Sequence, residues 1–315
     1  MPARILTLIL LLGVAASASA QAGSAPAPSA DPTSTTTPHG TTPASLPVEK
    51  LSQDQMKDLI RRVAENDMAN DKKLRDYTYT EREETKKLNK KGEVSSTESK
   101  TSEVLQIYGE TVEKLIAKND KPLSEKEAAK EDERIQKIID KRKNESDSAR
   151  EKRIKKEEKD REEGREFVKE VADAYNFTLL GVEPVNGRDA WVIQADPRPD
   201  YVPHKKEAKL LAKVVGKVWI DKEEDQWVRL DTRVTDTISF GLFLARLHEG
   251  TRVIVEQTRV NDEVWLPKHA AIHVDVRVAL LKNFDVDLDV TDRDYKKFRT
   301  GARIIGMQEV EVKDK

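Results

Sequence analysis

Hydrophobic residues near position 50 follow the spacing of a helix. Ser52 and Gln55 form a capping box, in which each side chain bonds to the backbone of the other residue at a helix start. Apolar residues then recur every three or four positions, at Met56, Leu59, Ile60, Val63 and Met68, and reach toward Leu74. We predict one amphipathic helix of about 20 residues, whose single apolar stripe packs on a sheet.

Alternation of apolar and polar residues near the end of the chain predicts two long strands. Apolar residues occupy every second position over 272–280 and again over 284–290. Because neighbouring residues of a strand point to opposite faces, each strand has one apolar and one charged face. A turn centred near Lys282 would place Arg277 opposite Asp287, which is a favourable cross-strand pair.

Shorter runs predict the rest of an antiparallel sheet. Asn186 and Gly187 form a strong hairpin signal. The strand-like runs are 77–82, 95–108, 113–117, 177–180, 190–195, 211–220 and 227–234. The chain is therefore predicted to be an α+β protein, with a large antiparallel sheet that has one wet face and helices over its dry face.

Residues 121–175 differ from the rest of the chain in their charge. They contain 17 basic and 17 acidic residues and few apolar ones. Ser124 and Ser148, each with a glutamate three residues later, predict the starts of two helices. Two interpretations remain open: an arm that binds a partner protein, or a solvated insertion that is anchored by its last two turns, at 167–175. The scarcity of apolar residues favours the insertion.

The first 47 residues have the pattern of an export signal and a linker. Arg4, the apolar run 5–14 and the small residues 18–20 predict a secretory signal peptide that is cleaved after Ala20. Residues 21–47 are rich in Ala, Pro, Ser and Thr and are expected to be a disordered tether. We therefore expect an exported protein, located in the periplasm if its host is a Gram-negative bacterium, with one folded domain over 48–315.

Composition removes several functional classes. Charged residues make up 36% of the chain, but 56 Lys and Arg balance 58 Asp and Glu, so the formal net charge is −2. A nucleic-acid binder that acts through its net charge does not fit this balance. The chain has no cysteine, which excludes disulfides, thiolate metal sites and a cysteine nucleophile.

Candidate residues for chemistry are few. The sequence contains no phosphate-loop, serine-nucleophile or zinc-helix motif. On extended chain, His269 and His273 would lie about 13 Å apart, and Asp285, Asp287 and Asp289 would be too widely spaced for calcium. The other histidines are His39, His204 and His248. We expect no enzymatic activity, no metal and no cofactor.

Residues 238–247 form a continuous apolar stretch without strand alternation and without the polar face of a helix. This stretch has two interpretations. It is either part of the core, or an apolar loop at the mouth of a cavity that holds an apolar ligand.

Four short motifs resemble those of bacterial outer-membrane lipoprotein-sorting proteins, the LolA/LolB-like carriers. They lie in order at 180–193, 216–221, 261–267 and 295–298, and they cover roughly residues 177–300. The resemblance implies a curved sheet that forms an incomplete β-barrel, with helices plugging its concave face. It also implies a cavity for acyl chains, with no cofactor and no catalytic residue. The charged helical insertion is not part of a minimal carrier.

We therefore expect an exported carrier or chaperone that buries the acyl chains of a lipid or lipoprotein against the helix at 52–74. The candidate contact residues are Trp191, Trp219, Phe240, Leu242, Phe243 and Leu244. Contact with the membrane would be peripheral or transient, and nucleic acid would not be a partner. The alternative is an envelope sensor or interaction protein of the same fold, which binds a protein partner through residues 121–175.

Overall fold

The computed structural model describes residues 51–205, 207–240, 245–278 and 282–298. The predicted signal peptide at 1–20 and the tether at 21–47 therefore lie outside the described residues.

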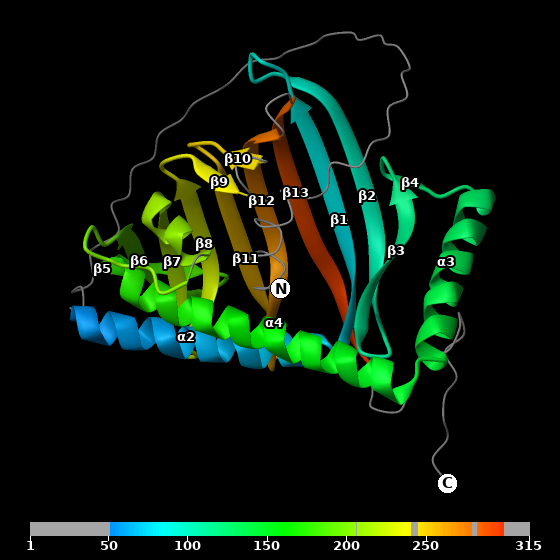
Figure 1. Ribbon diagram of the computed structural model, residues 1–315, viewed down its shortest axis with the longest axis horizontal. Coiled ribbons are helices and arrows are strands. Elements are labelled where there is room, and N and C mark those ends of the chain that lie inside the picture. The colour runs from blue at the N-terminus through cyan, green and yellow to red at the C-terminus, as the bar shows by residue number, and fades with distance from the viewer. Residues whose placement is uncertain (1–50, 206, 241–244, 279–281, 299–315) are drawn as a thin grey trace.

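One antiparallel sheet of 13 strands dominates the described chain, as the sequence predicts (Figure 1). Its main path runs in the order β4-β3-β2-β1-β13-β12-β11-β8-β7-β6-β5, and the hairpin β9–β10 joins it through β12. The first strands are β1 Tyr77–Leu88, β2 Val94–Ile107, β3 Glu110–Lys118 and β4 Lys121–Pro122. The others are β5 Tyr175–Val185, β6 Arg188–Pro197, β7 Val214–Asp221, β8 Gln226–Val234, β9 Ile238–Phe240, β10 Ala245–Leu247, β11 Arg252–Val260, β12 Val264–Val278 and β13 Lys282–Lys297.

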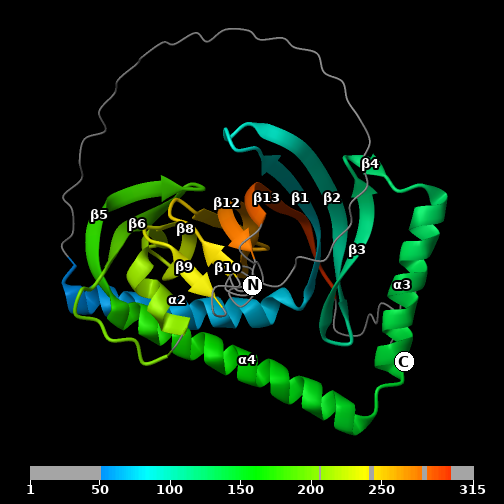
Figure 2. The same cartoon turned by 45° about the horizontal axis from the view of Figure 1, so that its top comes forward.

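The sheet is an incomplete barrel. Its path ends in β4 at one edge and in β5 at the other, and these two edges do not pair with each other. Figure 2 shows the sheet curving around a central space, with helices α2 (Gln53–Leu74) and α4 (Asp147–Ala174) running across one side of it. The fold class expected from the sequence is confirmed.

Helix α2 forms where the apolar stripe predicts it. Ser52 and Gln55 make the reciprocal contacts of a capping box. The apolar side of the N-terminal half of α2 packs on the sheet, where its residues Met56, Leu59, Ile60 and Val63 form one buried cluster with Trp191, Ile193, Val218 and Ile220. The stripe is therefore the contact that holds the helix on the sheet.

The charged insertion forms two helices, and both of them pack on the rest of the protein. Helix α3 (Glu125–Lys143) begins at the predicted cap, Ser124, but α4 is capped by Ser146 rather than by Ser148. The last turns of α4 contribute Phe167 and other apolar residues to the cluster beneath α2. Helix α3 has a core of its own against β2 and β3, formed by Ile107, Val112, Ile135 and Ile139. The insertion is therefore anchored to the rest of the protein by α3 as well as by the last turns of α4.

The predicted hairpin at the end of the chain forms, but with a different register. Arg277 lies opposite Asn283, and Asp287 lies opposite His273, so the expected pair of Arg277 with Asp287 is wrong. The turn is centred about two residues earlier than predicted. The alternation of faces is unchanged by this shift.

Side chains from two helices occupy backbone hydrogen-bonding groups at the two edges of the sheet. The amide of Gln53, at the start of α2, donates to the carbonyl oxygen of Phe177 on β5 and accepts from its N–H at 3.1 Å. At the other edge, the two-residue strand β4 covers β3 only at Ala117 and Lys118, and farther along β3 Glu131 of α3 accepts from the N–H of Leu115 at 2.9 Å. An unpaired edge strand is a template for aggregation, and these contacts shorten the exposed edge.

Candidate binding site on the inner face of the sheet

The inner face of the sheet is the face toward α2, and the strand registers place a continuous apolar row across it. The row takes one residue from each of β6, β7, β8, β11, β12 and β13: Ile193, Val218, Leu230, Val255, Ala270 and Val290. With about 4.8 Å between neighbouring strands, the row is about 24 Å long. The next two positions in the same line, on β1 and β2, are occupied by the charged residues Glu83 and Lys100.

A second row repeats this change in polarity. Val253, Ile272 and Leu288 follow one another on β11, β12 and β13, and Thr85 and Glu98 come next on β1 and β2. In these two rows the inner face is therefore apolar as far as β13 and polar on β1 and β2. Such a surface offers burial to an apolar chain and hydrogen bonds to a polar group at one end.

Helix α2 covers only part of the apolar region. A second buried cluster lies on β11 and β12 and the hairpin β9–β10, with members Val234, Ile238, Leu247, Val253, Val255, Ile272, Val274 and Val276. None of its described members comes from α2, α3 or α4. Phe284, which pairs with Val276 on this face, is 38% exposed.

The C-terminal half of α2 reaches the sheet through hydrogen bonds. Asp67, which is 8% exposed, accepts from Trp227 Nε1 at 2.7 Å and from Gln257 Nε2 at 3.3 Å. Gln257 accepts in turn from Gln226 at 3.0 Å, and Gln226 accepts from Asn70 at 2.8 Å. Burial raises the pKa of Asp67, although the two hydrogen bonds oppose the rise.

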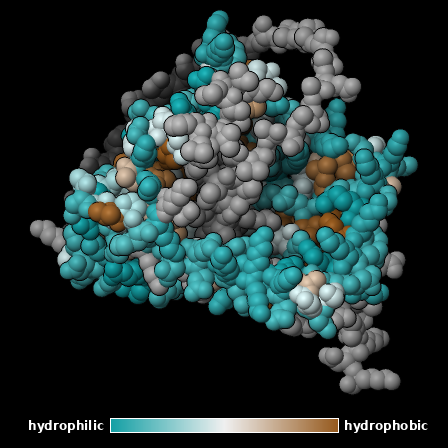
Figure 3. All heavy atoms as spheres, viewed as in Figure 1, coloured by the Kyte–Doolittle hydropathy of each residue, from teal (hydrophilic) through white to brown (hydrophobic). Residues whose placement is uncertain are grey.

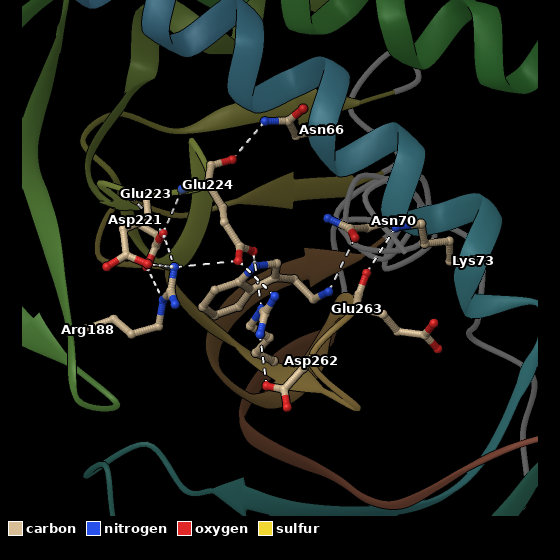
Figure 4. A network of polar contacts seen from close by, with 11 residues as sticks. Asn66, Asn70, Lys73, Arg188, Asp221, Glu223, Glu224, Asp262 and Glu263 are labelled. Carbon is tan, nitrogen blue, oxygen red and sulfur yellow. Dashed lines mark hydrogen bonds and ion pairs between the residues drawn. The ribbon is translucent and has the colours of Figure 1, made fainter.

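Further contacts of α2 reach the turns at the same end of the sheet (Figure 4). Asn66 Nδ2 donates to the carbonyl oxygens of Glu224 and Asp225, both at 3.0 Å, and Lys73 Nζ donates to that of Glu263 at 3.0 Å. These contacts end on backbone groups of two hairpin turns. They fix the C-terminal half of α2 together with the packing of Leu74 on Tyr77, Val264 and Leu266.

Arg188 and Asp221 form a buried ion pair beside these turns (Figure 4). Two hydrogen bonds join them, at 2.6 and 2.9 Å, and Asp221 is 1% exposed. Burial opposes the ionisation of Asp221, but the bonds from Arg188 and from the N–H groups of Glu223 and Glu224 leave its pKa lowered. Since these groups satisfy one another, the pair stabilises the turn rather than presenting a free charge.

The structure does not bring the predicted contact residues together. Trp191 lies on the inner face, in the cluster with α2, and lines a pocket of about 280 Å³ with Leu51 and Leu59. Trp219 lies on the opposite face, where its Nε1 donates to Glu183 at 2.8 Å. A single inner cavity therefore does not contact both tryptophans.

The apolar stretch 238–247 forms the hairpin β9–β10. Ile238 and Leu247 are buried in the second cluster. Phe240 ends β9, but its side chain is not described, and the predicted contacts Leu242, Phe243 and Leu244 lie outside the described residues. The stretch therefore contributes to the core at its two ends.

The outer face of β12 and β13 holds two histidine–aspartate pairs that the sequence analysis missed. His269 Nε2 lies 2.8 Å from Asp289, and His273 Nδ1 lies 2.8 Å from Asp287. His273, Asp287 and Asp289 line a groove of about 230 Å³. As predicted, the two histidines lie on extended chain, in β12. No group of three or more residues in the described part of the chain is arranged to hold a metal ion. Strand register was the missing signal for these pairs.

Helices α3 and α4 present a mostly hydrophilic surface, which Figure 3 shows as a nearly continuous band along α4. None of the helices in the described part of the chain combines the length and the apolar composition that crossing a membrane requires.

Several solved structures are similar to this chain, whereas no protein-family model and no curated protein matches its sequence. A domain described as an outer-membrane lipoprotein-sorting protein, from Vibrio parahaemolyticus, is 15% identical with a TM-score of 0.29, over 76% of this chain and 94% of that one. A LolA superfamily protein from Nitrosomonas europaea is 8% identical with a TM-score of 0.29, over 79% and 96%. MucB, solved in complex with MucA, is 12% identical with a TM-score of 0.21, over 75% and 93%.

The resemblance to lipoprotein-sorting proteins that the sequence motifs indicate is confirmed, in that proteins of this description are among these structures. At such TM-scores the whole chains superpose poorly, and the likeness carries no argument about a ligand or a partner. The incomplete barrel itself rests on the strand order and the registers described above.

Proposed function

We propose that the protein is an exported carrier that holds the acyl chains of a lipid or lipoprotein on the inner face of its sheet, in the periplasm. The change in polarity across this face carries the proposal. Beyond Ile193 and Val218, which α2 covers, an acyl chain laid along the row toward Val290 meets only apolar side chains, while Glu83 and Lys100 at its end suit a polar group.

The dimensions and the energetics fit this ligand. From Leu230 on β8 to Val290 on β13, beyond the residues that α2 covers, the row crosses three strand spacings, or about 14 Å, close to the roughly 15 Å that one acyl chain spans in half of a membrane core about 30 Å thick. Each methylene group that leaves water contributes about 0.8 kcal/mol, so a long chain binds without strong polar contacts. Binding and release, rather than bond chemistry, is the proposed activity.

Native mass spectrometry of the protein purified from its own host tests the proposal directly. We expect a bound species with the mass of a lipid, a fatty acid or an acylated peptide. Protein that is always free of acyl species, and that does not take up added fatty acid, would contradict the proposal.

Quenching of tryptophan fluorescence by a brominated fatty acid tests where the chain lies. Trp191 and Trp227 contribute to the inner cluster, whereas Trp219 and Trp265 share a cluster on the other face. We expect the brominated chain to quench the double variant Trp219→Phe/Trp265→Phe, and to have little effect on Trp191→Phe/Trp227→Phe. The reverse pattern would place the ligand on the outer face.

A matched pair of substitutions separates loss of binding from loss of stability. Leu288 and Ile254 are both half-buried aliphatic residues, but they point to the inner and the outer face respectively. We expect Leu288→Asp to weaken fatty-acid binding at least tenfold, since the contact of one aliphatic side chain contributes about 1.5–3 kcal/mol. Ile254→Asp should leave binding unchanged. Equal effects of the two substitutions would refute the site.

A protein partner for α3 and α4 is the second candidate function. The observation that favours it is the exposure of α4 between residues 151 and 163, where nearly every described side chain faces solvent, including Ile154. Under this hypothesis the native mass spectrum shows a bound polypeptide and no acyl species. The complex would then dissociate on the charge reversals Lys155→Glu and Lys159→Glu.

A further inference from the structure

The turn between β1 and β2 carries an unusual concentration of positive charge. Residues 86–94 contain the four lysines Lys86, Lys87, Lys90 and Lys91 and a single acid, Glu93, so their net charge is 4 − 1 = +3, whereas that of the whole chain is −2. The last pairing of β1 with β13 is at Lys87, and beyond it the hairpin pairs only with itself. Figure 1 shows this turn standing free at one end of the sheet.

The backbone of the turn is held in one conformation by Asn89. Its Oδ1 accepts from the N–H of Lys91 at 2.8 Å and from the N–H of Glu93 at 3.1 Å, and its Nδ2 donates to the Glu93 carboxylate at 2.9 Å. Gly92 completes the turn with a φ of 77°, which glycine adopts without strain. The lysines are therefore presented from a fixed base rather than from a loose loop.

The two lysines at the tip differ from others in the described part of the chain. Lys86 and Lys87, at the base of the same turn, lie 3.0 and 3.2 Å from carboxylate oxygens of Glu84 and Glu98. Among the described residues, neither Lys90 nor Lys91 has a carboxylate partner, and both are exposed. Their charge is therefore available to an external anion.

An apolar pair lies directly behind the lysines. Leu88 and Val94 are opposite each other in the hairpin, and Val94 is 55% exposed. Exposed apolar side chains next to lysines are typical of protein segments that rest in the interface of a bilayer, where the apolar groups enter the acyl boundary and the ammonium groups meet phosphates.

We infer that the β1–β2 turn is a docking site for a lipid bilayer with anionic headgroups. The lysines supply attraction to the surface charge, and Leu88 and Val94 supply shallow insertion. The turn has no aromatic side chain on which a base could stack, which disfavours single-stranded nucleic acid as the polyanion. Docking here needs no ligand on the inner face, so it holds or fails independently of the proposed carrier function.

Flotation of the full chain with lipid vesicles tests the inference. We expect binding to vesicles of phosphatidylcholine with about one third phosphatidylglycerol, and little binding to pure phosphatidylcholine. Each lysine near an anionic surface changes affinity about fivefold, so Lys90→Gln/Lys91→Gln should weaken binding roughly 25-fold. The matched control is Lys155→Gln/Lys159→Gln, which removes the same charge from exposed sites on α4 and should bind as the unaltered protein does.

Three further measurements decide the outcome. Binding should weaken steeply between low and high salt, a test that needs no variant, and Val94→Ser should weaken it at constant salt. The inference would be overturned if the two double lysine variants lost vesicle binding equally, or if the protein bound neutral vesicles as well as anionic ones. Equally tight binding to a soluble polyanion such as double-stranded DNA would also overturn it. Quenching by the brominated fatty acid should be unchanged in Lys90→Gln/Lys91→Gln, which separates docking from ligand binding.

Discussion

Replacing Asp67 with asparagine tests how much the buried charge of Asp67 lowers the free energy of unfolding. Asp67 lies in the half of α2 that contacts the sheet through hydrogen bonds. Burial raises the pKa of Asp67 in the folded protein, so the folded state binds a proton more tightly than the unfolded state does. The free energy of unfolding therefore falls as the pH rises from the unfolded pKa, near 3.9, through the higher folded pKa. The Asp67→Asn substitution removes this cost and keeps an oxygen that accepts from Trp227 and Gln257.

The change in the free energy of unfolding that Asp67→Asn causes depends on the two hydrogen bonds and on the burial of the charge. A hydrogen bond to a charged acceptor contributes about 1.5–3 kcal/mol and one to a neutral acceptor about 0.5–1.5 kcal/mol, so the two bonds together lose about 2 kcal/mol. Because the pKa is raised in spite of both bonds, the cost of burying the charge exceeds that loss. We therefore expect Asp67→Asn to be more stable than the unaltered protein at pH 7.5, with a higher midpoint of urea unfolding and a higher Tm.

Asp67→Ala is the matched control, because it removes the charge and the acceptor together. It leaves the Trp227 and Gln257 donors buried without a partner and should cost about 2–4 kcal/mol. Urea unfolding followed by far-UV circular dichroism, at pH 7.5 and at pH 4.5, measures both variants. The gain in Asp67→Asn should shrink at the lower pH. A loss of stability in Asp67→Asn at pH 7.5, or a gain that does not depend on pH, would refute the reasoning.

Three other substitutions test separate contacts. Asp221→Asn should cost about 3 kcal/mol at pH 7, because it removes the buried carboxylate that Arg188 contacts twice and leaves only the more exposed Glu223 and Glu224 as its charged partners. Since the pKa of Asp221 is lowered in the folded state, this difference should vanish in acid unfolding curves as the pH falls below about 4. Gly216→Ala should cost about 1–3 kcal/mol, because its Cβ would lie 3.0 Å from Thr232 Cγ2, and Thr232→Ser should recover part of the loss in thermal melts. Ser124→Ala should cost about 1 kcal/mol and speed amide exchange in α3 but not in α2.

Helix starts were readable from the sequence because the interacting groups are three residues apart. Ser52 and Ser124 cap α2 and α3 as predicted. For α4, two serines lie two positions apart, and the pairing of Ser148 with a later glutamate favoured the wrong one. The structure uses Ser146, whose side chain accepts from the N–H of Ala149 at 3.3 Å. Local chemistry identifies the helix, but it does not choose between neighbouring caps.

Strand register was beyond the sequence for a geometrical reason. The observed partner of Arg277 is Asn283, four residues from the predicted partner, Asp287. Because side chains alternate with a period of two, a shift of four residues leaves each one on its predicted face. The alternation therefore predicts the apolar and charged faces correctly and carries no information about which residues are opposite.

Trp191 and Trp219, two of the candidate contacts, lie on opposite faces for a related reason. Trp191 pairs with Ile220 across β6 and β7, so its neighbour Trp219 points to the other face. Two residues on adjacent strands point to the same face when they lie directly opposite each other, or an even number of positions from that. The local sequence does not determine which residues are opposite. The polar end of the inner face, at Glu83 and Lys100, was equally inaccessible, because β1 lies beside β13 only through a pairing that spans about 200 residues of sequence.

The side-chain contacts at the two sheet edges have a mechanical consequence. In a closed barrel the edge strands bond to each other, so the circumference is fixed by the ladder. Here Gln53 bonds to Phe177 at one edge and Glu131 bonds to Leu115 at the other, and neither edge depends on the opposite one. Small changes of twist between neighbouring strands can therefore widen or narrow the barrel without breaking a strand–strand hydrogen bond.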